Sequence, residues 1–140
     1  MTTRAVRAYV ALGSNLGDRE AHLAMARSRL DALPGTRVLA TSTIEETAPL
    51  GGMDQPPYLN QMVLVETTLS PRGLLTACRQ IERAAGRVRR ERWEPRTLDL
   101  DIVRFGDQQI ADTDLTVPHP GLSEREFWQR EVAELERHDV

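Results

Sequence analysis

The chain has 140 residues, of which 40% are apolar and 28% charged, and these values are typical of one globular domain with its own core. The formal net charge of −3 argues against a general binder of nucleic acid or of anionic membranes. All 18 basic residues are arginine, so the chain lacks the lysine of a phosphate-binding P-loop or of a Schiff base.

The single cysteine and the first residues bear on the compartment. Cys78 cannot form an internal disulfide and falls in an apolar helical row. The apolar run in MTTRAVRAYVALG is too short for a signal peptide or a membrane span. We therefore expect a soluble, cytoplasmic monomer whose residues 1–140 form a single domain, with neither a membrane nor a nucleic acid as partner.

The first part of the chain predicts two strands around a helix. Residues 8–12 predict a strand, and the turn that follows leads into a helix capped by Asp18, whose apolar stripe is Leu23, Ala26, Leu30 and Leu33. Residues 36–47 are rich in β-branched side chains and predict a second strand. Residues 48–57 contain three prolines and two glycines, which predicts a mobile loop and makes a lid plausible.

The second part predicts two more strands and two more helices. Residues 58–69 predict a third strand, and Ser70-Pro71 begins a helix that ends at Gly86 and has the apolar stripe Leu74, Cys78, Ile81 and Ala85. Arg79, Glu82 and Arg83 lie off this stripe and predict a solvated face with local ion pairs. Next come a strand at 98–105, a turn at 106–107, short extended structure at 110–117 and a helix at 124–135.

The order of these elements, βαββαβ, is that of a ferredoxin-like α+β sandwich, in which helices pack on an antiparallel sheet. That layout places the strands at 58–69 and 98–105 in one small sheet. Asn60 is the odd polar member of the apolar row Tyr58, Asn60, Met62 and Leu64. Its amide needs hydrogen-bond partners, which either a heterocyclic ligand or backbone groups would supply.

Two charged features lie next to each other between Gly86 and Phe105. The first is an arginine-rich loop, and such a loop suits phosphate. The second is the pair Asp99 and Asp101, which alternate with apolar residues and so point from one strand face, roughly 7 Å apart. The pair predicts either a magnesium site, because Mg²⁺ takes one or two carboxylates plus phosphate oxygens, or a solvated face paired with Arg96 and Arg104.

Several motifs, taken together and in order, resemble one family. RWEPRTLDLDI, GSNLGD, TAPLG, YLN and TVPH are similar to the motifs of 6-hydroxymethyl-7,8-dihydropterin pyrophosphokinases, and the resemblance runs from Tyr9 to about Phe127. It implies transfer of pyrophosphate from ATP to the hydroxymethyl oxygen of the reduced pterin, with release of AMP and the use of two Mg²⁺ ions. It also implies the same ferredoxin-like core.

The resemblance assigns expected roles to individual residues. Asp99 and Asp101 match the metal ligands, and Arg87 and Arg96 match the arginines that hold the phosphates. The further nucleotide contacts are expected from Arg89, Ile102, Leu115, Thr116, His119 and Arg125. The pterin contacts are expected from Thr47, Pro49, Leu50, Tyr58, Asn60 and Phe127, with Trp93 on a loop that closes over the site.

The sequence departs from the family pattern at several places. The arginine-rich loop is one residue shorter than in some relatives, and Asp114 occupies a position that is often basic. Pro120 and Gly121 follow His119 where a tyrosine or an arginine often stands. The segment after Phe127 is more charged than usual and short. Two alternatives therefore stay open: a family member with impaired turnover that binds ATP or pterin, and a ferredoxin-like RNA-binding module.

Overall fold

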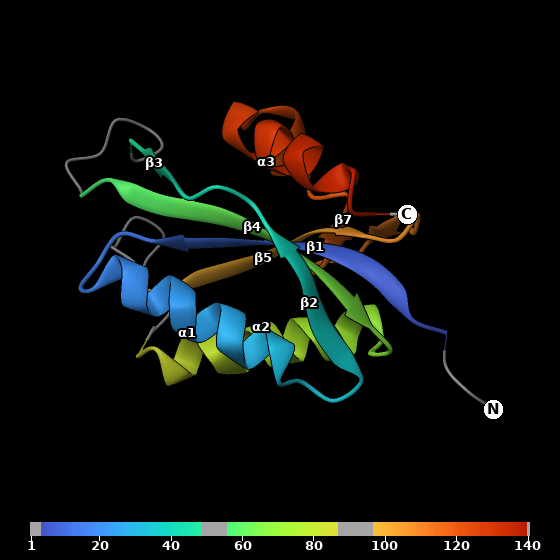
Figure 1. Cartoon of the computed structure of the whole chain (residues 1–140). Helices are drawn as coiled ribbons and strands as arrows, with labels where there is room; N and C mark the ends of the chain where they lie inside the picture. Colours follow the sequence, from blue (N-terminus) through green and yellow to red (C-terminus); the bar gives the residue numbers. More distant parts are fainter. Residues whose placement is uncertain (1–3, 49–55, 87–96, 140) are drawn as a thin grey trace.

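The computed structural model describes residues 4–48, 56–86 and 97–139. A single antiparallel sheet with strand order β2-β4-β1-β5 forms the centre, and β3 also pairs with β4. Helices α1 and α2 cover one face of this sheet, and α3 lies across the other (Figure 1). The predicted ferredoxin-like fold is confirmed, because the four main strands have the order and the antiparallel pairing of that fold.

The first strand and helix form where the sequence places them. Strand β1 spans Val6–Ser14, and α1 spans Arg19–Asp31. The side chain of Asp18 caps α1, since its Oδ1 accepts a hydrogen bond from the backbone N–H of Ala21 at 3.1 Å. Three residues of the predicted stripe are buried against the sheet: Leu23, Ala26 and Leu30.

The predicted single strand at 36–47 is wrong, because the structure has two strands there. They are β2, Thr36–Thr41, and β3, Glu45–Thr47, and both pair with β4. The interruption has its cause in Ser42, whose backbone N–H donates to the carbonyl of Met62 while its hydroxyl accepts from the Met62 N–H. The Gln61 side chain donates to the Ser42 carbonyl. These contacts replace the regular ladder.

Strand β4, Tyr58–Thr67, lies between β1 and the pair β2 and β3, and it is followed by α2, Pro71–Ala84. The hydroxyl of Ser70 accepts from the Gly73 N–H at 3.0 Å and caps α2 as predicted. Alternate residues of β4 face opposite layers of the molecule. One set packs under α1 and α2 (Leu59, Val63 and Val65), and the other packs under α3 (Met62 and Leu64).

Strand β5, Asp99–Phe105, is the edge strand that leads to the C-terminal part. The predicted extended run at 110–117 is a small hairpin of two strands, β6 (Ile110–Ala111) and β7 (Thr116–Val117). A 3₁₀ helix, η2 (Pro120–Ser123), and then α3 (Glu126–Glu136) complete the chain. Trp128, Val132 and Leu135 of α3 are buried on the second face of the sheet. No helix in the described residues is long and apolar enough to cross a membrane.

Candidate active site

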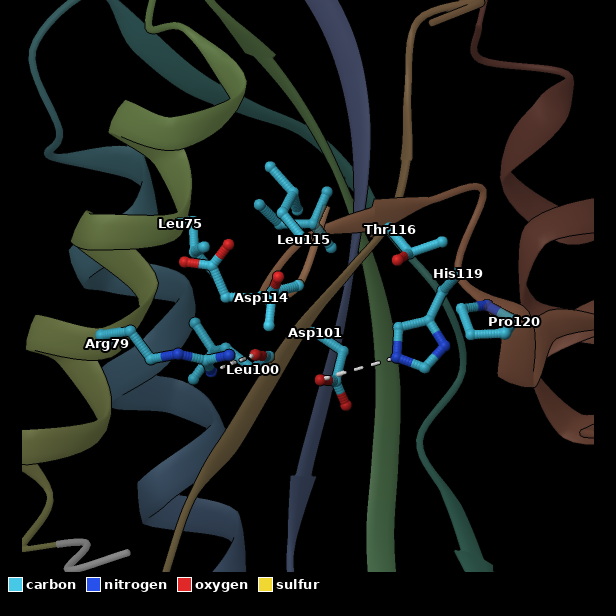
Figure 2. Close-up of a pocket in the computed structure, with 11 residues that line it drawn as sticks. Leu75, Arg79, Leu100, Asp101, Asp114, Leu115, Thr116, His119 and Pro120 are labelled. Carbon is cyan, nitrogen blue, oxygen red and sulfur yellow. Dashed lines mark hydrogen bonds and ion pairs between the residues drawn. The ribbon is translucent and has the colours of Figure 1, made fainter. Parts of the chain in front are cut away.

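A pocket of about 180 Å³ lies beside β5, between α2 and the segment that carries β7 and η2 (Figure 2). It has an apolar part and a polar part. The residues that line it are Leu75, Arg79, Leu100, Asp101, Ile102, Thr113, Asp114, Leu115, Thr116, His119 and Pro120. The structure therefore brings one predicted metal ligand, Asp101, to the same pocket as four predicted nucleotide contacts, which are Ile102, Leu115, Thr116 and His119.

The two aspartates lie on β5 as the alternation predicts. Leu98, Leu100 and Ile102 are buried in the layer under α1 and α2, while Asp99 and Asp101 face the opposite way and are partly exposed. Burial, and next the negative charge of Asp99, raise the pKa of Asp101 to about 7. The site is therefore electrostatically strained when both carboxylates are ionised, and a cation at this place would relieve that strain.

The alternative explanation for the aspartates was a solvated strand face paired with two arginines. The structure does not support an ion pair between these aspartates and Arg104, because Arg104 pairs with Glu136 of α3 at 3.5 Å. Arg96 lies outside the described residues. The positive charge that lowers the pKa of Asp101 most is that of Arg125, which comes from the segment before α3.

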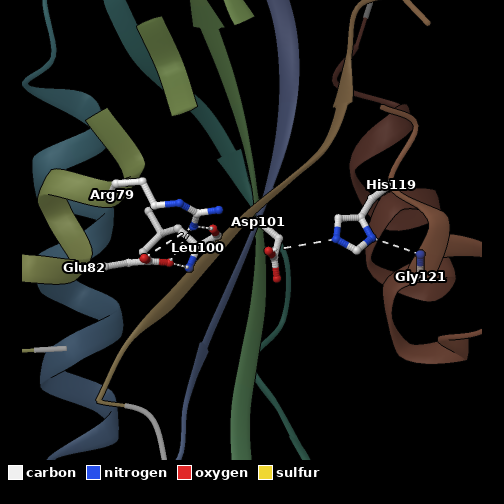
Figure 3. A network of polar contacts seen from close by, with 6 residues as sticks. All are labelled: Arg79, Glu82, Leu100, Asp101, His119 and Gly121. Carbon is white, nitrogen blue, oxygen red and sulfur yellow. Dashed lines mark hydrogen bonds and ion pairs between the residues drawn. The ribbon is translucent and has the colours of Figure 1, made fainter. Parts of the chain in front are cut away.

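His119 faces Asp101 across the pocket (Figure 3). Its Nδ1 accepts a hydrogen bond from the Gly121 N–H at 2.9 Å, so a neutral ring carries its proton on Nε2. Nε2 lies 3.9 Å from Asp101 Oδ1, which is too long for a direct hydrogen bond. Burial and the nearby Arg125 lower the pKa of His119. The ring therefore offers a neutral N–H donor beside the aspartates.

Gly121 permits the close packing around His119. A Cβ atom at this position would stand 3.1 Å from His119 Nδ1 and 3.2 Å from the Cζ atom of Arg125. The Arg125 guanidinium lies over the ring of Trp128, with 4.3 Å between Cζ and the ring centroid. At Gly121, where the sequence departs from the family pattern, the missing side chain thus leaves room for both the His119 ring and the Arg125 guanidinium.

Asp114, the acidic residue at a position that is often basic, is held by α2. Arg72 contacts Asp114 at 2.7 Å and Asp112 at 2.8 Å, and both aspartates belong to the hairpin segment at the pocket rim. The hydrogen bond from Arg72 lowers the pKa of Asp114. The acidic charge at this rim is therefore offset by a neighbouring arginine, and the contact attaches the hairpin to α2.

Sequence reasoning missed the role of Glu82, for which it predicted a solvated face. Glu82 is only 2% exposed, and its Oε2 accepts the Leu100 N–H at 2.8 Å (Figure 3). Arg79 contacts Glu82 at 3.2 Å and the Leu100 carbonyl at 3.5 Å. Since β5 is an edge strand, the N–H and carbonyl of Leu100 that face away from β1 bond to Glu82 and Arg79 of α2. The spacing Cys78 to Glu82, one helical turn, is the signal that places Glu82 at the margin of the apolar stripe.

The predicted pterin contacts in the described residues come from three elements. Thr47 ends β3, Tyr58 and Asn60 begin β4, and Phe127 lies in the first turn of α3. Asn60 is 7% exposed, and its Nδ2 donates to Thr47 Oγ1 at 2.6 Å. The structure thus links two predicted pterin contacts, Thr47 and Asn60, by a hydrogen bond between their side chains.

The remaining predicted site residues lie outside the described residues. They are Pro49 and Leu50 of the 48–57 segment, and Arg87, Arg89, Trp93 and Arg96 of the arginine-rich segment. The expected lid falls largely in the same range. Thr97 lies between the arginine-rich segment and the strand that carries the two aspartates. Its carbonyl accepts a hydrogen bond from the hydroxyl of Ser14 at the end of β1.

Comparisons with known proteins agree on one family. A family model described as 7,8-dihydro-6-hydroxymethylpterin-pyrophosphokinase matches residues 9–137. A 2-amino-4-hydroxy-6-hydroxymethyldihydropteridine pyrophosphokinase from Methylorubrum extorquens is 46% identical over 129 residues, which cover 92% of this chain and 82% of that protein. The Bacillus subtilis protein of the same name is 45% identical over 128 residues, covering 91% and 77%. That of Haemophilus influenzae is 43% identical over 122 residues, covering 87% and 76%.

Proposed function

Because this chain belongs to the 7,8-dihydro-6-hydroxymethylpterin-pyrophosphokinase family, we propose that it transfers the pyrophosphoryl group of ATP to 6-hydroxymethyl-7,8-dihydropterin in folate biosynthesis. The observation that carries this proposal is the pocket in which Asp101 and His119 stand next to the apolar residues Ile102 and Leu115. The apolar end, at Ile102 and Leu115, suits a purine base. The polar end, at Asp101 and His119, suits a phosphate group with its cation.

The carboxylates of Asp99 and Asp101 fit a magnesium site. Magnesium binds through one or two protein carboxylates and completes its shell with water and phosphate oxygens. Burial and next the negative charge of Asp99 raise the pKa of Asp101, so a cation beside the pair would favour the ionised carboxylates. We propose that the pair holds two Mg²⁺ ions, which when bound neutralise charge on the triphosphate.

The residues around the pocket would bind and orient the nucleotide. Ile102, Leu115 and Thr116 form the part in which adenine is expected to lie. His119 would donate its Nε2–H to a phosphate oxygen, because Nδ1 already accepts from Gly121. Arg125 adds positive charge beside the aspartates. By the family resemblance, Arg87, Arg89 and Arg96 would hold the phosphates as planar forks.

The pterin would bind between β4 and α3. Tyr58 and Phe127 would lie on the two sides of the ring, with Trp93 on the loop that closes over it. Asn60 would hydrogen-bond the ring, and Thr47 keeps the Asn60 amide in a single orientation. The backbone of residues 47–50, which include Pro49 and Leu50, would read the remaining ring edge. Placement of the hydroxymethyl oxygen in line with the β-phosphorus is then the main contribution of the protein.

The first prediction concerns the nucleotide product. Attack of the pterin hydroxymethyl oxygen on the β-phosphorus forms a new P–O bond and breaks the bond between that phosphorus and the oxygen bridging to the α-phosphorus. AMP should therefore appear in equal amount with the pterin methyl diphosphate. Chromatography of a reaction with purified protein, ATP, Mg²⁺ and the reduced pterin measures both products. ADP as the coupled product would contradict the proposal.

The alternatives from the sequence are less well supported. The RNA-binding module is not favoured, because the family match covers most of the chain. The turnover assay separates an active enzyme from a member that only binds its ligands. We also propose that the protein acts as a cytoplasmic monomer. Among the described large apolar side chains only Leu16 and Ile44 are exposed, which supports the monomer, and size-exclusion chromatography with light scattering tests it.

A second prediction concerns the substitution Asn60→Ala. It removes the amide expected to contact the pterin, so pterin binding should weaken by roughly 1 to 3 kcal/mol, the cost of buried polar groups left unpaired. ATP binding should change little. Calorimetry with each ligand measures both effects. Thr47→Val removes the hydroxyl partner but keeps the amide, so it should weaken pterin binding less than Asn60→Ala does. Equal losses for the two ligands would show that Asn60 has a structural role only.

A further inference from the structure

Two glutamates of different elements meet beneath α3. Glu131 of α3 is 1% exposed, and within the described part of the chain neither of its carboxyl oxygens has a hydrogen-bond partner. Oε2 of Glu45, on β3, is also buried and lacks such a partner there. The other oxygen of Glu45 accepts from the Arg130 guanidinium at 3.0 Å. Two ionised carboxylates in this arrangement would be strongly disfavoured.

A single proton resolves this arrangement. If Glu131 is protonated, its O–H can donate to Glu45, and two of the three unpartnered oxygens become paired. Burial raises the pKa of Glu131 to about 9, and the hydrogen bond that the protonated side chain donates to Glu45 acts in the same direction. That hydrogen bond, followed by the contact with Arg130, lowers the pKa of Glu45. Glu131 is thus the proton donor, and Glu45 is the ionised acceptor.

The pair lies between β3 and α3, two of the three elements that carry predicted pterin contacts. Glu45 is the Cα partner of Asn60 in the β3 and β4 ladder, and it lies two residues before Thr47. Glu131 lies one helical turn after Phe127. The other links at this interface are exposed: Arg130 with Glu45, and Glu134 with the N–H and hydroxyl of Thr43. Exposed ion pairs and hydrogen bonds contribute little to stability. We therefore expect the buried pair to fix the relative position of β3 and α3 more strongly than they do.

We propose that Glu131 and Glu45 share one proton, and that this buried contact positions β3 against α3 so that the two sides of the pterin site stay in register. The proposal rests on the proposed function, because the segments it joins are those expected to hold the pterin. Glu131 and Glu45 are positioning residues, since neither is expected to touch the substrate.

The other ionisable groups near this interface must be considered in any pH experiment. On α3 itself the charges of Arg130 and Glu134 act on Glu131. The titratable and charged groups that the sheet presents on the side of α3 are Arg7 and Tyr9 of β1, Arg37 of β2, Tyr58 and Glu66 of β4, and Asp99, Asp101 and Arg104 of β5. All of them remain in a Glu131 variant, so their effects cancel when variant and wild type are compared at each pH.

The shared proton is tested by thermal unfolding of the ligand-free protein between pH 5.5 and 9.5. In the folded state Glu131 keeps its proton up to about pH 9, whereas in the unfolded state it loses it near its usual 4.5. The Glu131 contribution to wild-type stability therefore falls as pH rises across this range. Glu131→Gln keeps a donor to Glu45 without a titrating proton. Its melting temperature minus that of wild type should rise steadily with pH.

The matched control is Glu136→Gln on the same helix, where the glutamate is exposed and pairs with Arg104. Its melting temperature should differ from that of wild type by an amount that changes little across the same pH range. A difference between Glu131→Gln and wild type that is equally flat would overturn the shared proton. The experiment needs only the folded Gln variant, so it remains decisive if a more disruptive variant fails to fold.

The positioning role is tested by steady-state kinetics at pH 7.5. Glu131→Ala removes the donor and should raise the KM for the pterin by roughly five- to tenfold, the size of one buried hydrogen bond, with the KM for ATP unchanged. Glu131→Gln should restore the pterin KM. Equal rises for both substrates, or no recovery with Gln, would overturn the positioning role. Absence of pterin turnover in the wild type would refute the proposed function, while the unfolding series would still decide the shared proton.

Discussion

Replacing Asp101 with asparagine is expected to lower turnover by several orders of magnitude while the fold is retained. Asparagine has the same size and suits the same place on β5, whose alternate residues Leu100 and Ile102 stay buried. It removes a charged ligand from the site proposed to hold magnesium beside the triphosphate. Turnover at saturating ATP, pterin and Mg²⁺ measures the loss, and circular dichroism verifies the fold.

The same substitution has an expected signature in stability. Burial and Asp99 raise the pKa of Asp101 from 3.8 to about 7. Between these values the folded protein holds a proton that the unfolded chain has released, so this contribution to wild-type stability falls as pH rises from about 4 to 7. Asp101→Asn lacks this dependence. Above pH 7 in metal-free buffer, the variant should be as stable as the wild type or more stable.

Magnesium with nucleotide should raise the melting temperature of the variant less than that of the wild type. Asp107→Asn is the control, because Asp107 lies in the exposed turn after β5 and outside the pocket. It should leave turnover and the magnesium effect unchanged. Near-normal turnover of Asp101→Asn, or a large loss of its stability without metal, would mean that the aspartates have a structural role and would remove the support for the magnesium site.

Removing the Glu82 side chain is expected to have the largest effect on stability. Glu82→Ala leaves the Leu100 N–H without its acceptor and leaves Arg79 without its buried partner. Leaving the buried Leu100 N–H without its charged acceptor costs about 1 to 3 kcal/mol, and the loss of the ion pair with Arg79, whose side chain is 31% exposed, adds to this. Denaturant unfolding measures the change. Turnover should also fall, because Leu100 lies between Asp99 and Asp101 and fixes their strand.

Two further variants separate the causes. Glu82→Gln keeps an oxygen that can accept from Leu100 but has no charge for Arg79, so its loss should be smaller than that of Glu82→Ala. Glu20→Ala on the exposed side of α1 should change the unfolding free energy by less than about 0.5 kcal/mol. A loss for Glu82→Ala as small as that for Glu20→Ala would show that the contact with β5 does not hold the edge strand.

Much of the fold and of the candidate site could be predicted because the signals are local. The caps Asp18 and Ser70 need only the next turn of their own helices, and both lie where they were predicted. The alternation around Asp99 and Asp101 directs both acids to one face through the period of a strand alone. The choice of residue types, two acids beside an arginine-rich segment, already indicated phosphate chemistry.

The rest depended on which segments the sheet brings together. The strand predicted at 36–47 is divided because Ser42 bonds to Met62 and Gln61, which lie about twenty residues away. Glu82 and Glu131 have carboxyl side chains next to apolar stripes, and such residues are usually exposed. They are buried here because β5 ends the sheet beside α2 and because α3 covers the face of the sheet on which Glu45 of β3 lies. A helical pattern determines which residues share a face, but the position of the neighbouring strand decides how far around the helix that buried face extends.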